Sequence, residues 1–259
     1  MRLASWNVNS LKVRLPQLLD WLALHRPDVI CLQETKLEDD RFPVLEIEAA
    51  GYRCAWSGQK TYNGVAILSQ GTLGDVTAGM PAFPDHQKRV IAASVSHGAS
   101  AVRVICAYVP NGQAVGSEKY DYKLRWLAAF RNWLEQELRK TPRLAVLGDY
   151  NVAPADEDVH DPLAWRGQIL CSAPERAAFE TLLALGLKDS FRMFPQKEKS
   201  FTWWDYRMNG FKRNLGLRID HALLSSELAS QCRASSIDVE PRRKERPSDH
   251  APIMADLDI

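Results

Sequence analysis

Residues 120–152 read YDYKLRWLAAFRNWLEQELRKTPRLAVLGDYNV, and this stretch decides the fold. Large apolar residues recur every three or four positions in its first part, which predicts an amphipathic helix over 120–140. Residues 144–147 are apolar without alternation, as in a strand buried on both faces. The strand ends in Asp149 and Asn151, and polar residues at such an end indicate a cleft beside an α/β sheet.

The rest of the chain continues the alternation of helices and strands. Leucines at helical spacing precede Pro27, which ends a first helix, and a third helix over 175–185 stops at Gly186, a residue suited to a left-handed cap. Because the later part of each half is rich in strands, we expect two sheets packed face to face with helices outside, rather than a doubly wound parallel sheet. We expect one domain over residues 1–259. Strands are expected at 2–8, 29–32, 52–56, 64–69, 89–96, 102–109, 144–147, 219–224 and 251–257.

The composition is that of a globular protein, with 46% hydrophobic and 25% charged residues in 259 positions. The five cysteines form no CxxC pair, so the sequence implies neither a disulfide framework nor a zinc site, and reduced thiols are expected. The N-terminus lacks the pattern of an export signal, and no apolar run reaches the roughly 18 residues of a membrane span. We therefore expect a soluble, cytoplasmic protein with no membrane partner.

The net charge of +1 does not by itself indicate a nucleic-acid partner. Basic residues nevertheless gather at 207–218 and 242–246, close in sequence to Asp220 and Asp249. Such runs are most often solvated faces, but their position beside acidic candidates favours a nucleic-acid ligand.

Four apolar runs end in polar residues that could converge on one metal-and-phosphate site. They are SWNVNS at 5–10, ICLQETK at 30–36, LAVLGDYNV at 144–152 and RPSDHAPI at 246–253. Each motif alone is a weak signal, since Asp and Asn after a strand usually make turns. Together they offer hard oxygen ligands and one histidine, a pattern that indicates a phosphodiesterase.

Asp149 and Asn151 are two positions apart, so in an extended segment both side chains face the same way while Tyr150 faces the core. Asn7 and Asn9 share this spacing. A carboxylate beside a neutral amide suits a phosphoryl site, because the carboxylate can align or deprotonate water and the amide can bind a phosphate oxygen. The alternative for Asp149 is an Asx turn that closes the strand.

Glu34 follows the expected strand over 29–32, which places it at a strand end rather than on a solvated helix. A single carboxylate there suits magnesium, which takes one or two protein oxygens and keeps most of its waters. The alternative is a salt bridge to Lys36 or Arg41.

Asp249 and His250 are adjacent, and adjacent residues of an extended chain point to opposite faces, so they are not expected to bond to each other. His250 then needs another carboxylate to fix its tautomer, and Asp220 is the best candidate. Asp249 would be free to approach a metal directly or through water. His221, beside Asp220, leaves some ambiguity in this pairing.

Two aromatic positions add to the candidate site. FTWWDY at 201–206 places large rings beside a basic run. Paired tryptophans usually pack in a core, but one ring near a phosphate could stack on a base or sugar. Tyr108 ends the strand over 102–109 and offers a phenol to the same cleft.

Eight motifs follow one another along essentially the whole chain: SWNVNS, LQETK, GQKTYNGVAILS, AYVPNG, LGDYN, TWWDYR, GLRIDH and SDHAP. In this order and spacing they resemble the exonuclease III branch of the endonuclease/exonuclease/phosphatase superfamily. The resemblance implies a four-layer α/β sandwich and an enzyme that uses magnesium, or manganese in its place, on double-stranded DNA. It also implies 3′-to-5′ exonuclease, 3′-phosphatase or 3′-phosphodiesterase, and apurinic/apyrimidinic (AP) endonuclease activities in base-excision repair; we expect a monomer.

The same resemblance assigns roles to residues of this chain. Asp149 would orient the attacking water, Asp220 would orient His250, and Glu34 would bind the metal. The implied catalytic residues are Tyr108, Asp149, Asn151, Asp220 and His250; the implied metal site comprises Asn7, Glu34, Asp149, Asn151, Asp249 and His250; the implied DNA contacts are Arg89, Trp203 and His250.

One position departs from the pattern of the branch. In WRGQILCS at 165–172, Leu170 stands where members that cut abasic sites well commonly carry glycine. A bulkier side chain there could obstruct an extruded abasic sugar, so we expect stronger degradation of 3′ ends than incision of abasic sites. The alternative is that Leu170 caps a hydrophobic cluster with Ile169 outside the cleft.

Two other functions share features with this interpretation. A lipid or inositol phosphodiesterase would use the same fold and catalytic set, but the segment around Trp203, the basic runs and the missing export signal favour DNA. A catalytically silent nucleic-acid-binding protein would be expected to have lost the ligands, and all of them are present here.

Overall fold

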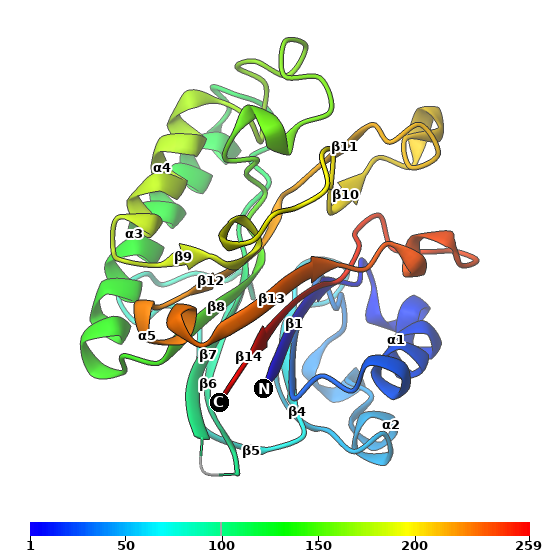
Figure 1. The fold of residues 1–259 in the computed structure, drawn as a ribbon, viewed down its shortest axis with the longest axis vertical. Helices are drawn as coiled ribbons and strands as arrows, with labels where there is room; N and C mark the ends of the chain where they lie inside the picture. The colour runs from blue at the N-terminus through cyan, green and yellow to red at the C-terminus, as the bar shows by residue number, and fades with distance from the viewer. Residues whose placement is uncertain (99) are drawn as a thin grey trace.

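Two six-stranded sheets pack face to face, with helices on the outer face of each (Figure 1). The computed structural model describes residues 1–98 and 100–259. The first sheet has the order β13-β14-β1-β2-β4-β3, and the second has the order β5-β6-β7-β8-β12-β9. In these orders, the strands of the first sheet are Cys232–Ile237, Ile253–Leu257, Arg2–Asn7, Val29–Gln33, Val65–Ser69 and Arg53–Ser57. Those of the second are Thr72–Ala78, Val90–His97, Ser100–Tyr108, Leu144–Asp149, Asp220–Leu224 and Lys188–Asp189.

The outer layers are helical and complete the predicted α/β sandwich. Helices α1 (Leu11–His25) and α2 (Val44–Ala49) pack on the first sheet, and α3 (Glu118–Lys140) and α4 (Ala173–Leu183) pack on the second (Figure 1). Within the described part of the chain, no helix has the length and apolarity needed to cross a membrane. The remaining elements are α5 (Ser226–Ser230), the hairpin of β10 (Trp203–Trp204) and β11 (Gly216–Leu217), and 3-10 turns at 39–41, 156–158, 190–193, 207–209 and 240–243.

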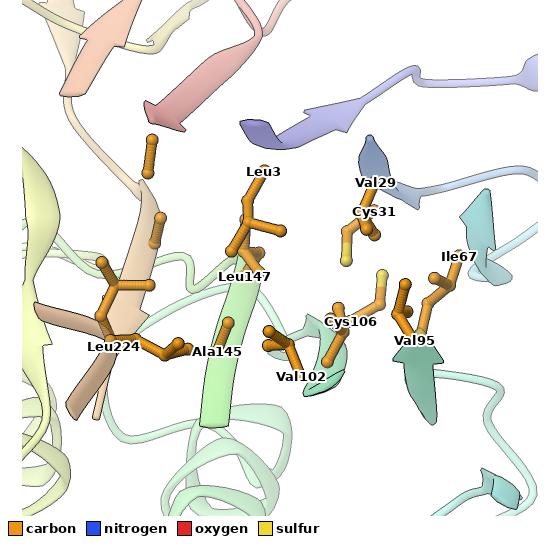
Figure 2. Packing of buried hydrophobic residues seen from close by; sticks show 14 of the residues in the cluster. Leu3, Val29, Cys31, Ile67, Val95, Val102, Cys106, Ala145, Leu147 and Leu224 are labelled. Carbon is orange, nitrogen blue, oxygen red and sulfur yellow. The ribbon is translucent and has the colours of Figure 1, made fainter. Parts of the chain in front are cut away.

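The inner strands β1, β2, β4, β8 and β12 are buried on both faces, which is why they read as continuous apolar runs. Leu3 of β1 and Leu147 of β8 belong to the cluster that fills the space between the sheets (Figure 2). Their neighbours Ala4 and Val146 point the opposite way, each into the cluster beneath its own layer of helices. The alternation of Cβ directions along a strand thus supplies two different cores from one apolar run.

Most predicted elements are present, and the unpredicted strands of the two large sheets lie at sheet edges. The predicted helix over 120–140 is α3, which starts slightly earlier because the Ser117 hydroxyl accepts the amide of Tyr120 at 3.2 Å. The predicted third helix is α4, and the chain leaves it through Gly186, whose φ of 94° is left-handed. Strands β5 and β13 were not predicted, because both are edge strands whose outward residues are exposed and break the apolar pattern.

The register of the strands brings the candidate residues to one end of the sandwich. Strands β1 and β2 are parallel neighbours, so Asn7 and Glu34 emerge at the same edge. In the second sheet, β7 and β8 are parallel with Tyr108 opposite Asp149, and β12 is antiparallel to β8 with Asp220 opposite Asp149. Polar ends of strands from both sheets therefore meet at one place.

Candidate active site

Asn7 joins the two sheets at the centre of the site. Its side chain is buried, and its Nδ2 donates to Oε1 of Glu34 at 2.9 Å and to Oδ2 of Asp149 at 2.9 Å. Its Oδ1 accepts the amide of Asn9 at 3.0 Å, which fixes the orientation of the side-chain amide. One neutral group therefore holds carboxylates from both sheets without adding charge.

Glu34 leaves β2 in the left-handed conformation, with a φ of 52°. Its Oε2 lies 2.9 Å from Nζ of Lys36, so the salt bridge considered as an alternative to a metal role is present. A carboxylate has about four acceptor sites, and Lys36 and Asn7 occupy two of them, which leaves acceptor capacity for other groups. The salt bridge and metal binding are therefore compatible.

Asp149 is bound to Asn151 through a turn rather than along a strand. The Asn151 amide donates to Oδ1 of Asp149 at 2.9 Å, and its Nδ2 lies 3.3 Å from Oδ2. Asn151 has a φ of 49°, so the extended segment predicted here is wrong: an asparagine tolerates this left-handed conformation, and the Asx turn follows from it. The Asx turn considered as an alternative for Asp149 therefore brings the side-chain amide of Asn151 to the Asp149 carboxylate. Tyr150 is buried, as predicted.

The carboxyl group of Asp149 is 1% exposed. Burial raises the pKa of Asp149 to about 7, and the charge of His250 only partly opposes this effect. In the metal-free protein the group therefore exchanges its proton near neutral pH, as a general base requires.

His250 is held by Asp220, with Nδ1 and Oδ2 2.9 Å apart. Its Nε2 lies 3.7 Å from Oδ2 of Asp149 and so faces the site. Burial alone would lower the pKa of His250, but attraction to Asp220 and Asp149 outweighs it and raises the pKa to about 10. His221, the other candidate partner, has its Nδ1 2.9 Å from the guanidinium of Arg218 and serves the core instead.

Asp249 points away from His250, as expected for adjacent residues. Its Oδ1 accepts Nδ2 of Asn9 at 2.8 Å, and its Oδ2 accepts Nε1 of Trp203 at 3.0 Å. These bonds connect the last polar motif to the first one and to the β10 hairpin.

Tyr108 and Arg89 line the opposite side of the site. The Arg89 guanidinium lies 4.7 Å from the centroid of the Tyr108 ring. Burial, and then the charge of Glu34, raise the pKa of Tyr108 well above its usual range, so the phenol stays a neutral hydrogen-bond donor. Nε and Nη2 of Arg89 both donate to Oε1 of Gln87, at 2.9 and 2.7 Å, which fixes the guanidinium.

The donor set fits a divalent cation. Glu34, Asp149 and His250 each offer a ligand atom, and these atoms lie within 4.8 Å of one another. Carboxylate oxygens are the ligands that magnesium and manganese prefer, and a cation would compensate two carboxylates that are held close together. Of the other predicted metal-site residues, Asn7 and Asn151 bind Asp149, whereas Asp249 is bonded to Asn9 and Trp203.

Leu170 and Trp203 belong to one apolar cluster beside the site. Leu170 is 4% exposed and has a φ of 72°, in the region that favours glycine. Ile169 packs against the same cluster, so Leu170 does cap it, but Ile219 of the cluster directly precedes Asp220. The cluster therefore borders the site rather than lying apart from it.

Two arginines of the basic runs are buried and take no part in an exposed nucleic-acid surface, whereas the other six basic residues of these runs are exposed. Arg218 is 1% exposed and binds the carboxylates of Asp158 and Asp189. Arg242 is 6% exposed, with its guanidinium 5.0 Å from the centroid of Phe211. Both arginines support the loops around the site from inside, so this interpretation is wrong for them.

Two residues at the site were missed in the sequence. Nδ2 of Asn111 donates to Oδ1 of Asn151 at 3.1 Å, and Nζ of Lys123 donates to the Asn151 carbonyl at 2.7 Å. Asn111 carried a usable signal, since it follows the strand of Tyr108 in the motif AYVPNG. Lys123 carried none, because one lysine among the polar positions of a helix has no mark of burial.

A two-sheet sandwich with this group of carboxylates, amides and a carboxylate-bound histidine at its strand ends defines a phosphoesterase of the metal-dependent α/β-sandwich class. The chain belongs to the Endonuclease/Exonuclease/phosphatase family, whose model matches residues 4–250.

Individual relatives match over the full chain. Exodeoxyribonuclease III of Haemophilus influenzae is 38% identical over 99% of this chain and 100% of its own length. Among solved structures, the Neisseria 3′ phosphatase NExo, bound to a product DNA hairpin, has a TM-score of 0.97 at 48% identity, and an AP endonuclease from Archaeoglobus fulgidus has a TM-score of 0.94 at 37% identity. Each of the two solved chains is covered completely, as is this one.

Proposed function

We propose that this protein is a divalent-metal-dependent DNA phosphodiesterase of base-excision repair, with 3′-to-5′ exonuclease and 3′-end-processing activity on double-stranded DNA. The observation that carries the proposal is the continuous chain of contacts from Asp220 through His250 and Asp149 to Asn7 and Glu34. The relatives support the substrate, since they are named as an exodeoxyribonuclease, a 3′ phosphatase on DNA and an AP endonuclease.

The metal site is assigned to Glu34, Asp149 and His250, with Asn7, Asn151 and Asp249 around them. Magnesium is proposed as the natural ion and manganese as its substitute, because the donors are mainly oxygens. When bound, the cation would neutralise charge on the scissile phosphate and on the departing 3′ oxygen.

The remaining catalytic roles are assigned to side chains of the protein. Asp149 orients the attacking water and can take its proton, since its pKa lies near neutrality. The cationic His250, held by Asp220, and the amide of Asn151 stabilise charge that grows on the non-bridging oxygens. Tyr108 donates from the other side as a neutral phenol.

Arg89 and Trp203 are proposed as DNA contacts on the two sides of the site. The guanidinium of Arg89 is fixed by Gln87 and can meet a phosphate, and the partly exposed ring of Trp203 can stack on a sugar or base. Leu170 fills the cluster under Trp203, so we propose that AP endonuclease activity is weak relative to the processing of 3′ ends. We further propose a single-domain monomer over residues 1–259 that acts in the cytoplasm, where the five free thiols stay reduced.

A duplex assay tests the proposed function. The protein is incubated with labelled duplexes that carry a recessed 3′ end, a 3′-phosphate or an internal abasic site, each with magnesium, with manganese and with a chelator. We expect metal-dependent removal of 3′ nucleotides and of the 3′-phosphate, and slower abasic incision. Hydrolysis of inositol phosphates or phospholipids, with no activity on any duplex, would refute the proposal in favour of the lipid-type enzyme; duplex binding without any hydrolysis would favour the silent binding protein.

A further inference from the structure

A buried ion pair lies directly behind the candidate active site. Lys123 of α3 and Glu175 of α4 have side chains that are 0% exposed, and Nζ and Oε1 are 2.5 Å apart. Burial lowers the pKa of Lys123, with attraction to Glu175 opposing it, which shows how unfavourable this position is for a cation. Desolvation cancels much of the attraction within a buried ion pair, so a contribution to folding stability alone does not explain why this pair is present.

Each end of the pair holds a different loop of the site. The ammonium of Lys123 donates to the carbonyl of Asn151 at 2.7 Å and to that of Asn111 at 3.2 Å. The carboxylate of Glu175 accepts the backbone amide of Leu170 at 3.0 Å on Oε1, the oxygen that also faces the ammonium. Three loops that are far apart in sequence therefore meet at one pair of charges.

Two of the residues whose backbone groups bind this pair are in the left-handed conformation. The φ angles of Asn151 and Leu170 are 49° and 72°. Residues other than glycine persist in this region only where the surroundings hold them. Lys123 binds the carbonyl of the first residue, and Glu175 binds the amide of the second.

The Gly112 turn also packs closely against Lys123 and the 169–170 segment. A Cβ placed on Gly112 would lie 3.1 Å from Cδ of Lys123 and 3.0 Å from Cδ1 of Ile169. The turn that follows Asn111 thus approaches both the lysine stem and the 169–170 segment closely. Gly112 has a φ of 90° and no side chain to separate them.

We propose that Lys123 and Glu175 form one positioning unit. Lys123 binds the Asn151 carbonyl and thereby orients the side-chain amide of Asn151 toward the reacting phosphate, and Glu175 links Lys123 to the Leu170 segment. Neither side chain reaches the substrate, so both act through the residues they hold. The effect on catalysis rests on the proposed function, in which Asn151 stabilises charge on the phosphate. The contacts of Lys123 and Glu175 with the two loops do not depend on that function.

The test uses three variants of the full chain. Lys123→Met removes the cation, Glu175→Gln removes the anion and keeps one of its two acceptor oxygens, and the double variant removes both charges so that no buried charge is left alone. The matched control is Glu137→Gln, which breaks the pair of Glu137 with Arg103; Glu137 also lies on α3, and both side chains of that pair are 7% exposed.

The readouts are kcat and KM on a duplex with a recessed 3′ end, the thermal midpoint, and the NMR signals of the Asn151 side-chain amide. We expect Lys123→Met to lower kcat by about 10- to 100-fold with little change in KM, as for residues that orient catalytic groups. The double variant should recover thermal stability relative to Lys123→Met without recovering kcat. Its Asn151 signals should be displaced, whereas those of the control should match the wild type.

Two results would overturn the positioning unit. One is a double variant with wild-type kcat, and the other is a set of Asn151 signals that do not move when Lys123 is replaced. If the wild-type protein hydrolyses no duplex, the proposed function fails, and the NMR comparison still decides whether Lys123 positions Asn151.

Discussion

Replacing Leu170 separates the packing of this residue from its backbone conformation. The side chain is 4% exposed in the cluster beneath Trp203, and its φ is 72°. Truncation of a buried leucine to alanine costs about 2–5 kcal/mol. A residue with a Cβ in the left-handed region carries about 1–2 kcal/mol of strain, which glycine relieves and alanine keeps.

The expected order of stability is therefore unusual. Leu170→Gly should be more stable than Leu170→Ala by about 1 kcal/mol, the relieved strain less the extra entropy of an unfolded glycine. At ordinary helix or strand positions glycine is instead about 0.5–1 kcal/mol worse than alanine. Urea unfolding followed by circular dichroism measures both differences, and an alanine variant at least as stable as the glycine variant would refute the strain at this position.

The same two variants test the role of Leu170 in substrate choice. Both empty the space beneath Trp203, so both should raise the ratio of abasic incision to 3′-end removal by about tenfold, which corresponds to about 1.4 kcal/mol of relieved obstruction. Single-turnover rates on two labelled duplexes of the same sequence give this ratio. Leu163→Ala serves as the control, since Leu163 lies in the same loop but is 77% exposed. Efficient abasic incision by the wild-type protein, unchanged in both variants, would show that Leu170 only packs.

Three further predictions concern the charged groups. Glu34→Gln and Asp149→Asn should each lower metal-dependent hydrolysis by about 10²- to 10⁴-fold while duplex binding, followed by fluorescence anisotropy, is retained; near wild-type rates would contradict the site assignment. Asp220→Asn should impair hydrolysis strongly and lower the pKa of His250 from about 10, and an unchanged NMR titration of His250 would exclude the orienting role. Because burial raises the pKa of Asp149 from 3.8 to about 7, the folded metal-free protein takes up a proton that the unfolded chain does not bind between these values. Asp149 should therefore contribute about 2 kcal/mol to a rise in stability between about pH 8.5 and pH 5.5, and His250, whose pKa is also raised, should add to the same rise. Denaturant titrations in the presence of a chelator should show a smaller rise in Asp149→Asn.

The elements that the sequence predicted are those whose pattern is set by burial. The helix over 120–140 was found because burial of one face leaves a period in the sequence, and the strand over 144–147 was found because burial of both faces leaves an unbroken apolar run. Edge strands such as β5 leave none, since most of their side chains meet solvent. The polar ends of β1, β2, β8 and β12 could also be predicted, because a polar residue that borders an apolar run shows where a strand leaves the core.

The contacts within the site were less predictable than its members. The Asx turn at Asp149 depends on a left-handed Asn151, and spacing alone favoured an extended segment. The buried roles of Arg218 and Lys123 depend on partners about 30 to 60 residues away, so nothing in their own neighbourhoods distinguishes them from solvated charges. Pairing of His250 with Asp220 was predictable because adjacent residues of a strand cannot share a face, which left few carboxylates to choose from.

Backbone strain and long-range contacts are linked at this site. Glu34 and Asn151 both have positive φ, and the carbonyl of each is bound by a donor from another element: the amide of Ser10 at 2.8 Å for Glu34, and the ammonium of Lys123 for Asn151. A residue in this conformation reverts to commoner backbone angles when its partners are absent. Glu34 and Asn151, the proposed metal ligand and the proposed phosphate-facing amide, therefore reach their positions only after helices and sheets have packed. The geometry of the site is for this reason a product of the tertiary structure, even though most of its proposed functional side chains stand beside a strand that the local sequence predicts.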